Sequence, residues 1–203
     1  MITCLTVGPF QENCYLLVQD GDLAIFDPGD EPDRLIEAIE QTGAKPRYIL
    51  LTHAHLDHVG ACKALQDRYD IPVCVPRDEV ELLENLPLQC QLFGMPPLPQ
   101  PRIDRVLEGH ETLPFGAAHL EQIATPGHSP GGVSYRFGDH VFVGDTIFAG
   151  GVGRTDLWGG SWPTLQASIE ERLFTLHDRV TLYPGHGPTT SVGAERRSNP
   201  FFN

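Results

Sequence analysis

The sequence has few basic side chains. Only 14 Lys and Arg residues accompany 27 Asp and Glu residues, and the formal net charge of the 203 residues is −13 at pH 7. A protein with this charge repels polyanions over most of its surface, which argues against broad binding to nucleic acid or to an anionic membrane. No apolar run reaches the ~18 residues of a transmembrane helix. Because Met1–Leu5 lacks the basic start of a secretion signal, we expect a cytoplasmic protein.

Cysteines at metal-binding or redox spacing are also absent. The five cysteines, at positions 4, 14, 62, 74 and 90, are odd in number and scattered along the chain. This pattern predicts neither a disulfide framework nor a zinc knuckle nor a redox dithiol. We therefore expect reduced, mostly packed thiols.

Apolar periodicity predicts a similar order of elements in two halves of the chain, roughly 1–85 and 105–185, which look like a pseudo-duplicate. In the first half we expect strands at 2–7, 14–18, 23–26, 48–51 and 73–75, and helices at 32–43, 61–69 and 78–84. In the second half we expect strands at 120–124, 133–137, 141–143 and 179–183, with a helix that begins at 162–163 and continues to Leu176. The fold class indicated is α+β: two sheets packed face to face with helices outside, in a single domain of residues 1–203.

A proline-rich segment, residues 86–104, separates the two halves. It carries Pro87, Pro96, Pro97, Pro99 and Pro101, and this density of proline predicts irregular structure throughout. We favour a surface excursion. The other interpretation is a loop over a site, since long ordered loops often carry function.

The strongest chemical signal is the run Thr52-His-Ala-His-Leu-Asp-His58, directly after the expected strand 48–51. In extended backbone alternate side chains point the same way, so His53, His55 and Asp57 converge, and His58 can turn in from the next helix. Imidazole and carboxylate ligands suit zinc, iron or manganese, and a site without thiolates is typical of catalysis. A lone histidine would be interpreted as a packing or surface residue, but this cluster predicts a metal site.

Three further residues have the context of ligands: His128, Asp145 and His186. Each follows an expected strand and a sharp turn, and a glycine beside each lets the backbone approach a metal closely. The other histidines lack this context and are expected at the surface: His110, His119, His140 and His177. Asp27 has two open interpretations, as the cap of the following turn or as a hydrogen-bond partner of a metal-bound histidine.

Together with these candidate ligands, four short stretches resemble the metallo-β-lactamase superfamily, and within it the short bacterial glyoxalase II-like branch. They are Gly144–Phe148, Gly151–Asp156, Pro184–Pro188 and Glu195–Phe201. The resemblance spans the whole chain and implies a four-layer αββα sandwich. It also implies two divalent metal ions, with zinc the first choice and iron or manganese as alternatives. One ion would lie on His53, His55 and His128 and the other on Asp57, His58 and His186, with Asp145 bridging both.

The same resemblance implies hydrolysis of a thioester, S-D-lactoylglutathione or a related hydroxyacylglutathione, by a metal-bridging hydroxide. Asp57 is then the catalytic residue that orients this hydroxide or moves its proton. Arg154, Arg196 and Asn199 are the implied substrate contacts. The chain departs from longer glyoxalase II enzymes, since Asp156 stands in place of a tyrosine and only 17 residues follow His186. These departures favour weak binding of glutathione.

The sequence is also compatible with other functions. A persulfide dioxygenase of the same superfamily needs one iron, on positions that correspond to His53, His128 and Asp145. A phosphodiesterase or ribonuclease is disfavoured by the net charge, and a β-lactamase by the absence of a secretion signal. A metal-binding module without catalysis is the least favoured alternative. The expected partner is a small-molecule thioester, with no nucleic acid and no membrane, and the oligomeric state is unknown.

Overall fold

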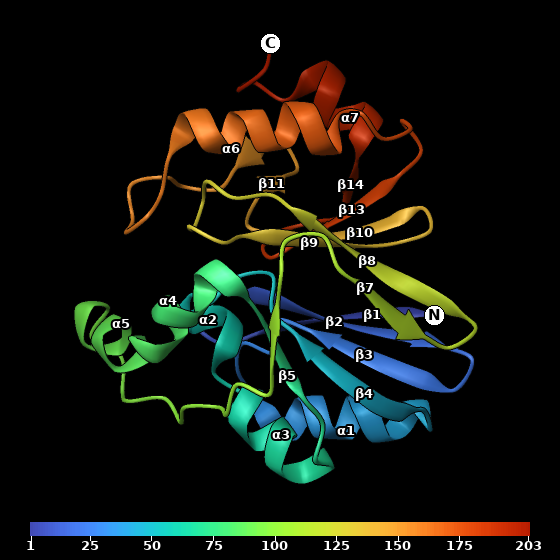
Figure 1. The fold of residues 1–203 in the computed structure, drawn as a ribbon, viewed down its shortest axis with the longest axis vertical. Coiled ribbons are helices and arrows are strands. Elements are labelled where there is room, and N and C mark those ends of the chain that lie inside the picture. The colour runs from blue at the N-terminus through green and yellow to red at the C-terminus, as the bar shows by residue number, and fades with distance from the viewer.

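The computed structural model describes residues 1–203, and its strands form two six-stranded sheets and one short hairpin (Figure 1). The first sheet has the order β1 (Ile2–Val7), β2 (Glu12–Gln19), β3 (Asp22–Phe26), β4 (Lys45–Leu50), β5 (Val73–Pro76) and β6 (Arg105–Leu107). The second has the order β14 (Thr190–Ser191), β13 (Thr181–Pro184), β10 (His140–Gly144), β9 (Val133–Phe137), β8 (Ala118–Ala124) and β7 (Thr112–Phe115). The hairpin pairs β11 (Ile147–Phe148) with β12 (Gly151–Val152).

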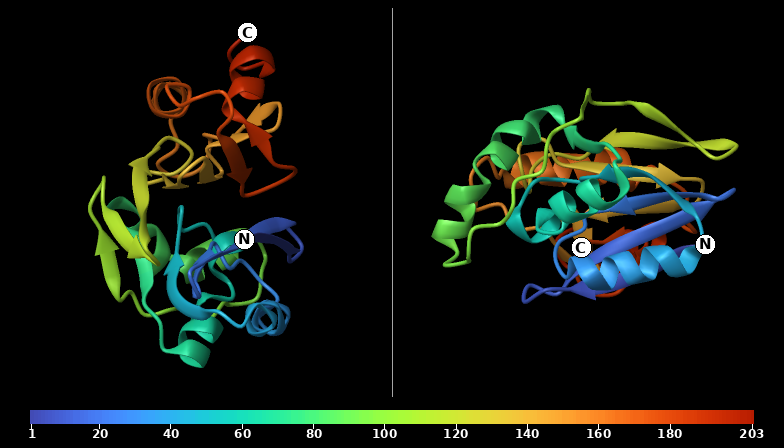
Figure 2. Two further views of the ribbon diagram at one scale, coloured as in Figure 1. Left: turned by 90° about the vertical axis from the view of Figure 1, so that its right-hand side faces the viewer. Right: turned by 90° about the horizontal axis from the view of Figure 1, so that it is seen from below.

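Helices cover the outer face of each sheet. In Figure 1, α1 (Pro32–Thr42) and α3 (Cys62–Tyr69) lie below the first sheet, and Figure 2 shows them from below. Above the second sheet lie α6 (Trp162–Ser168), its π-helical continuation Ile169–Leu173, and α7 (Val192–Ser198). The remaining helices are α2 (Leu56–Val59), a 3-10 turn (Arg77–Glu79), α4 (Val80–Glu84) and α5 (Leu86–Leu92). The predicted αββα sandwich is confirmed.

Alternating strand residues build the apolar layers between these elements. In β2, Leu16 faces the cluster shared with α1 and α3, whereas Tyr15 and Leu17 face the cluster between the sheets. This period of two is the expected property of a strand buried on both faces. Between the sheets, the rings of Phe26 and Phe142 stack with centroids 3.9 Å apart. A third cluster joins the second sheet to α6.

The proline-rich segment differs from the expectation of irregular structure throughout. Residues Leu86–Leu92 form α5, with Pro87 in its first turn. Proline is tolerated there because the N–H groups of the first turn have no partner within the helix. Only residues 93–104 are irregular, and β6 then returns to the first sheet beside β5. The other elements that were not predicted are β6, β7, α7, the short helix α2 and the two-residue strands β11, β12 and β14.

Every helix of the structure is too short or too polar to span a lipid bilayer.

Packing between the sheets yields a first prediction. Phe142→Ala removes a ring that is 1% exposed, and such a cavity should lower the free energy of unfolding by about 3–5 kcal/mol. Leu92→Ala, at a side chain that is 75% exposed, should change it by no more than ~0.5 kcal/mol. Urea denaturation of metal-free protein measures both. Equal effects of the two substitutions would show that this inter-sheet contact does not stabilise the fold.

Candidate metal centre

The candidate ligands gather where strand ends from both sheets meet. Strands β8 and β10 both run antiparallel to β9, and β13 runs parallel to β10, so the carboxyl ends of β8, β10 and β13 lie at one edge. His128, Asp145 and His186 follow these three ends. The first sheet contributes residues 53–58, beyond the end of β4. Seven residues from four separate stretches of the chain are thereby brought together.

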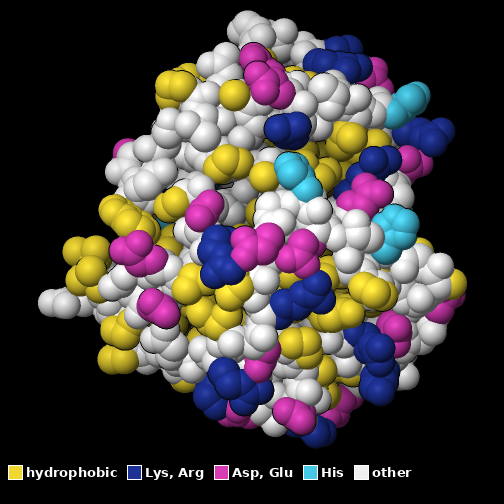
Figure 3. Space-filling view, in the orientation of Figure 1, with side chains coloured by type: hydrophobic (Ala, Val, Ile, Leu, Met, Phe, Trp, Pro, Cys, Tyr) yellow, Lys and Arg dark blue, Asp and Glu magenta, His cyan; other side chains and the backbone are white.

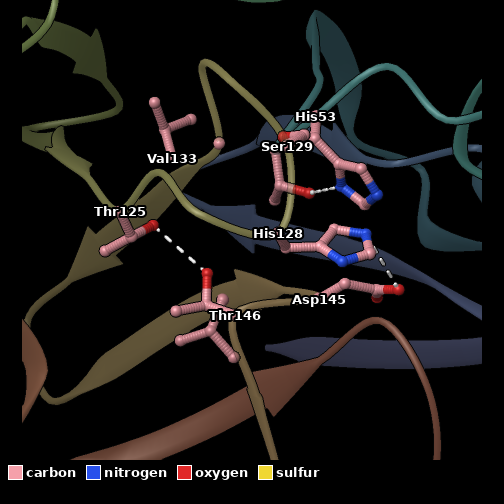
Figure 4. A pocket seen from close by; sticks show the side chains of 10 residues that line it. His53, Thr125, His128, Ser129, Val133, Asp145 and Thr146 are labelled. Carbon is pink, nitrogen blue, oxygen red and sulfur yellow. Dashed lines mark hydrogen bonds and ion pairs between the residues drawn. The ribbon is translucent and has the colours of Figure 1, made fainter. Parts of the chain in front are cut away.

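Three histidines form the first group. Ligand nitrogens of His53, His55 and His128 all lie within 4.8 Å of one another. His55 Nδ1 and His128 Nε2 are 2.9 Å apart, and Figure 4 shows His53 and His128 directed toward each other and toward Asp145. This arrangement can hold one cation.

The second group consists of Asp57, His58 and His186, again within 4.8 Å of one another. Asp145 lies between the two groups. Its Oδ1 is 3.4 Å from His58 Nε2, and its Oδ2 is 3.7 Å from His128 Nε2 and 3.5 Å from His186 Nε2. One carboxylate therefore faces candidate ligands of both groups.

Unpartnered atoms indicate that the cluster fits metal ions. His53 Nε2, His58 Nε2 and Asp145 Oδ1 are buried and have no hydrogen-bond partner. Leaving a buried polar atom without a partner costs about 1–3 kcal/mol. A divalent cation among these atoms would give each of them a partner, and the imidazole and carboxylate donors are those that such cations bind in proteins.

The histidines of the cluster differ in the direction in which burial and neighbouring charges shift their pKa. Burial lowers the pKa of His53 well below its ordinary value and that of His55 to about 3, so both are neutral and ready to donate a lone pair. Burial also acts to lower the pKa of His58, but the carboxylates of Asp145 and Asp57 raise it well above the ordinary value. Negative charge is thus concentrated beside His58. A bound cation would take the place of the proton there.

Asp27 orients His58. Its Oδ2 lies 3.1 Å from His58 Nδ1, which leaves the other ring nitrogen to face Asp145. Asp27 also accepts hydrogen bonds from the backbone N–H of Thr52 at 2.7 Å and from its hydroxyl at 2.6 Å. Asp27, His53 and His58 also offer ligand atoms within 4.8 Å, but these hydrogen bonds to Thr52 favour the role of a partner to a ligand.

Two glycines permit the close approach of the ligand loops. Gly144 has a φ of +50°, and a Cβ there would lie 2.2 Å from Thr52 Oγ1. A Cβ on Gly185 would lie 2.2 Å from Asp145 Oδ1. Any side chain at either position would displace part of the cluster, which agrees with the role expected for glycine beside the candidate ligands.

Two buried side chains that the sequence analysis missed hold the ligand loops in place. Glu79 accepts the N–H of Ala54 at 2.8 Å and that of Gly131 at 2.6 Å, so it joins the loops that carry His53 and His128. Gln89 of α5 donates to the carbonyl of Ala54 and accepts from the N–H of Leu56, both at 3.0 Å. Polar residues in short helices are ordinarily exposed, so the sequence offers no signal for these contacts.

Glu12 is a third missed residue. Its side chain is buried, neither of its oxygens has a hydrogen-bond partner, and Oε1 lies 3.9 Å from His58 Nδ1. Burial raises its pKa well above the ordinary value. Glu12 therefore adds a second carboxyl group, beside Asp27, on the buried side of His58.

A cavity of about 200 Å³ opens over the cluster. It is lined by His55, Leu56, Asp57, Gln89, His128, Asp145 and His186, and toward solvent by Phe10, Phe93, Arg154 and Leu157. Because Phe93 follows α5, the segment 86–104 contributes a wall of this cavity. This placement favours the second interpretation, a loop over a site.

Of the three residues expected to contact the substrate, one lines the cavity. Arg154 lines the cavity and makes two hydrogen bonds with the Asp156 carboxylate, both 2.7 Å. Arg196 instead binds the carbonyl of Phe174 and pairs with Asp178. Asn199 is fully buried and donates to Gly151 and Glu195. Neither Arg196 nor Asn199 lines the cavity, and both make contacts in and around the C-terminal helix, so substrate contact by these two residues stays a prediction.

With this geometry in place, sequence comparison identifies the family. A family model described as the metallo-beta-lactamase superfamily matches residues 7–186, and the chain belongs to this superfamily. The chain is 44% identical to the probable metallo-hydrolase YqgX of Bacillus subtilis, covering 98% of this chain and 96% of the relative. It is 40% identical to hydroxyacylglutathione hydrolase GloC of Haemophilus influenzae, covering 100% and 98%. The protein is a metallo-hydrolase with histidine and aspartate groups for divalent metal.

Solved structures share the fold over nearly the whole chain. The BLEG-1 B3 metallo-beta-lactamase is 38% identical with a TM-score of 0.94, and the match covers 100% of both chains. TTHA1623 in a di-iron-bound form is 39% identical with a TM-score of 0.89, covering 98% and 99%. ETHE1 from Myxococcus xanthus is 28% identical with a TM-score of 0.81, covering 98% and 83%.

The contacts of Glu79 yield a second prediction. Glu79→Gln keeps the size of the side chain but replaces one accepting oxygen with an N–H₂ group, so one of two buried backbone donors loses its acceptor. We expect a loss of about 1–3 kcal/mol in unfolding free energy and a metal affinity roughly 10-fold lower. Competition with a chromophoric chelator measures the affinity. Glu84→Gln, at an exposed position in α4, is the matched control. Identical behaviour of both variants would show that Glu79 does not hold the two ligand loops together.

Proposed function

We propose that this protein is a dinuclear metal-dependent thioester hydrolase, and that its substrate is S-D-lactoylglutathione or a related hydroxyacylglutathione. The observation that carries this proposal is the position of Asp145, whose two oxygens face candidate ligands of two separate groups. The 40% identity to a hydroxyacylglutathione hydrolase over the full chain supports the choice of substrate.

The proposed ligands form two sets, which are the two groups whose ligand atoms lie close together. His53, His55 and His128 would hold one ion, Asp57, His58 and His186 the other, and Asp145 would contact both. Zinc is the first choice for nitrogen and carboxylate donors. Iron is the main alternative, because one structural neighbour was solved in a di-iron-bound form.

When bound, two divalent ions lower the pKa of water toward neutrality and stabilise negative charge on a carbonyl oxygen. In the hydrolysis the oxygen of water joins the acyl carbon, the C–S bond breaks, and a proton passes to the thiolate. No serine or cysteine nucleophile is required.

Asp57 is the residue of this chain best placed to handle the proton of the attacking water. Its carboxylate lines the cavity, with Oδ2 3.3 Å from His186 Nε2. Burial acts to raise the pKa of Asp57, but the neighbouring His58 and His186 bring it below the ordinary value. The carboxylate is therefore ionised at neutral pH and can accept a hydrogen bond from water.

The cavity walls complete the site. Gln89 keeps the backbone of residues 54–56 in place, and thus the direction of the side chains at 55 and 57. Phe10 and Phe93, whose rings meet edge to face at 6.3 Å, narrow the access of bulk water from one side. A small-molecule thioester could place its reacting carbonyl in this cavity, with the rest of the molecule outside it.

A persulfide dioxygenase is the second candidate. It is supported by the convergence of His53, His128 and Asp145 in Figure 4, the three positions that a single iron would need. This alternative requires neither Asp57 nor His186. The two candidates therefore differ in metal count, in use of oxygen and in their dependence on the second group.

The first test combines metal content with activity. We expect two metal ions per chain by elemental analysis, and cleavage of S-D-lactoylglutathione that chelation abolishes, metal restores and removal of oxygen leaves unchanged. One iron per chain, with oxygen uptake on glutathione persulfide and no thioester cleavage, would overturn the hydrolase. Two metal ions per chain with neither activity would show that a hydroxyacylglutathione is not the substrate.

Substitution of the second group separates the candidates further. Asp57→Asn and His186→Ala should each reduce thioester cleavage by at least about 100-fold, because each removes a donor from one ion. Elemental analysis should show about one metal per chain lost. His119→Ala, at an exposed histidine away from the cluster, is the control. Full activity of both cluster variants would indicate that a single-metal site performs the reaction.

A further inference from the structure

Exposed apolar side chains are concentrated at the mouth of the cavity. Seven large apolar side chains are exposed in the whole chain, and only Met1 and Phe201 lie elsewhere. The other five line the cavity over the cluster or the groove next to it: Phe10, Leu88, Leu92, Phe93 and Trp158. In Figure 3, yellow side chains accordingly gather at the left edge, where Figure 1 places α5. A contiguous exposed apolar patch marks a binding surface.

The groove adjoins the reaction cavity. Its volume is about 280 Å³, and it lies between α4, α5 and Trp158. Gln89 lines both spaces, and Leu157 of the cavity is the chain neighbour of Trp158 in the groove. A molecule whose reacting carbonyl lies beside Asp57 could therefore extend past Gln89 into the groove.

Away from the candidate metal ligands, the side chains that line these two spaces do not favour an anionic group. Arg154 is the one Lys or Arg that lines either of them, and Asp156 already occupies its guanidinium through two hydrogen bonds. The groove itself contributes a carboxylate, Glu81. A carboxylate of the substrate would have to displace Asp156, whereas an apolar group would find Leu88, Leu92 and Trp158 without competition.

We propose that the groove of Leu88, Leu92 and Trp158 binds an apolar substituent of the substrate, so that the protein prefers thioesters with an apolar chain or ring. This inference rests on the metal-dependent thioester hydrolase proposed above, but it favours an apolar thioester over the hydroxyacylglutathione named there. The substituent is carried either by the acyl group or by the thiol. Both bring the same apolar surface into the groove.

Two substrate series test the groove with metal-loaded protein. In the first, the acyl chain on N-acetylcysteamine, a neutral thiol, is lengthened from acetyl to octanoyl; in the second, the acetyl group stays and the thiol chain is lengthened. We expect kcat/KM to rise at least ~10-fold along one series, which identifies the side that enters the groove. A flat response in both series would overturn the inference.

Variants connect the preference to the groove. Trp158→Ala and Leu92→Gln should each lower the ratio of kcat/KM for the longest and shortest substrates by about 10-fold. Phe201→Ala, which removes an exposed ring outside both spaces, should leave this ratio unchanged. A ratio that is the same in Trp158→Ala and in the wild type would also overturn the inference.

A binding measurement separates this inference from the proposed function. Ketone analogues, with CH₂ in place of the thioester sulfur, cannot be hydrolysed, and calorimetry should show tighter binding as the chain lengthens. If binding tightens while no thioester is cleaved, the groove is supported and the hydrolase is overturned. If thioesters are cleaved without regard to chain length, the hydrolase remains and the groove is overturned.

Discussion

The structure depends on one electrostatic constraint, the burial of many ionisable groups in a single cluster between the two sheets. Asp145 has an oxygen without any partner, and His53 and His58 each direct an unpartnered nitrogen to the same place. In a low-dielectric interior this arrangement is costly unless a cation occupies it. These atoms therefore lower the stability of the metal-free fold, and bound metal would restore it. Folding and metal binding are linked in this way.

The rest of the fold acts to hold that cluster in place. Parallel pairing of β10 with β13 brings Asp145 and His186 to one edge of the second sheet, and the inter-sheet core fixes the first sheet against it. Glu79 then joins the loops from the two sheets, and Asp27 turns His58 toward Asp145. Such supporting contacts set the direction of each ligand more closely than strand geometry can.

The groove proposed to select the substrate lies in a different part of the chain from most candidate ligands. Helix α5 and the turn at Leu157–Trp158 contribute no candidate ligand, yet they line the cavity and its groove. Because Arg154 is paired with Asp156, the one basic side chain near the mouth is not free to bind an anionic ligand. Gln89 links the two parts, since it lies in α5 and also holds the loop that carries His55 and Asp57.

Local patterns in the sequence determined most of the longer strands, the sandwich and the seven candidate ligands. The continuous apolar runs of β2 and β3, the spacing of residues 53–58 and the glycines beside Asp145 and His186 all act over a few residues, so a sequence displays them directly. Only tertiary structure placed Glu79, Gln89 and Glu12 at the cluster, and it shows Arg196 and Asn199 in contacts around α7 instead of in the wall of the cavity. The physical reason is that their contacts join residues distant in sequence: Glu79 meets Ala54 and Gly131, and no periodicity records such a partner.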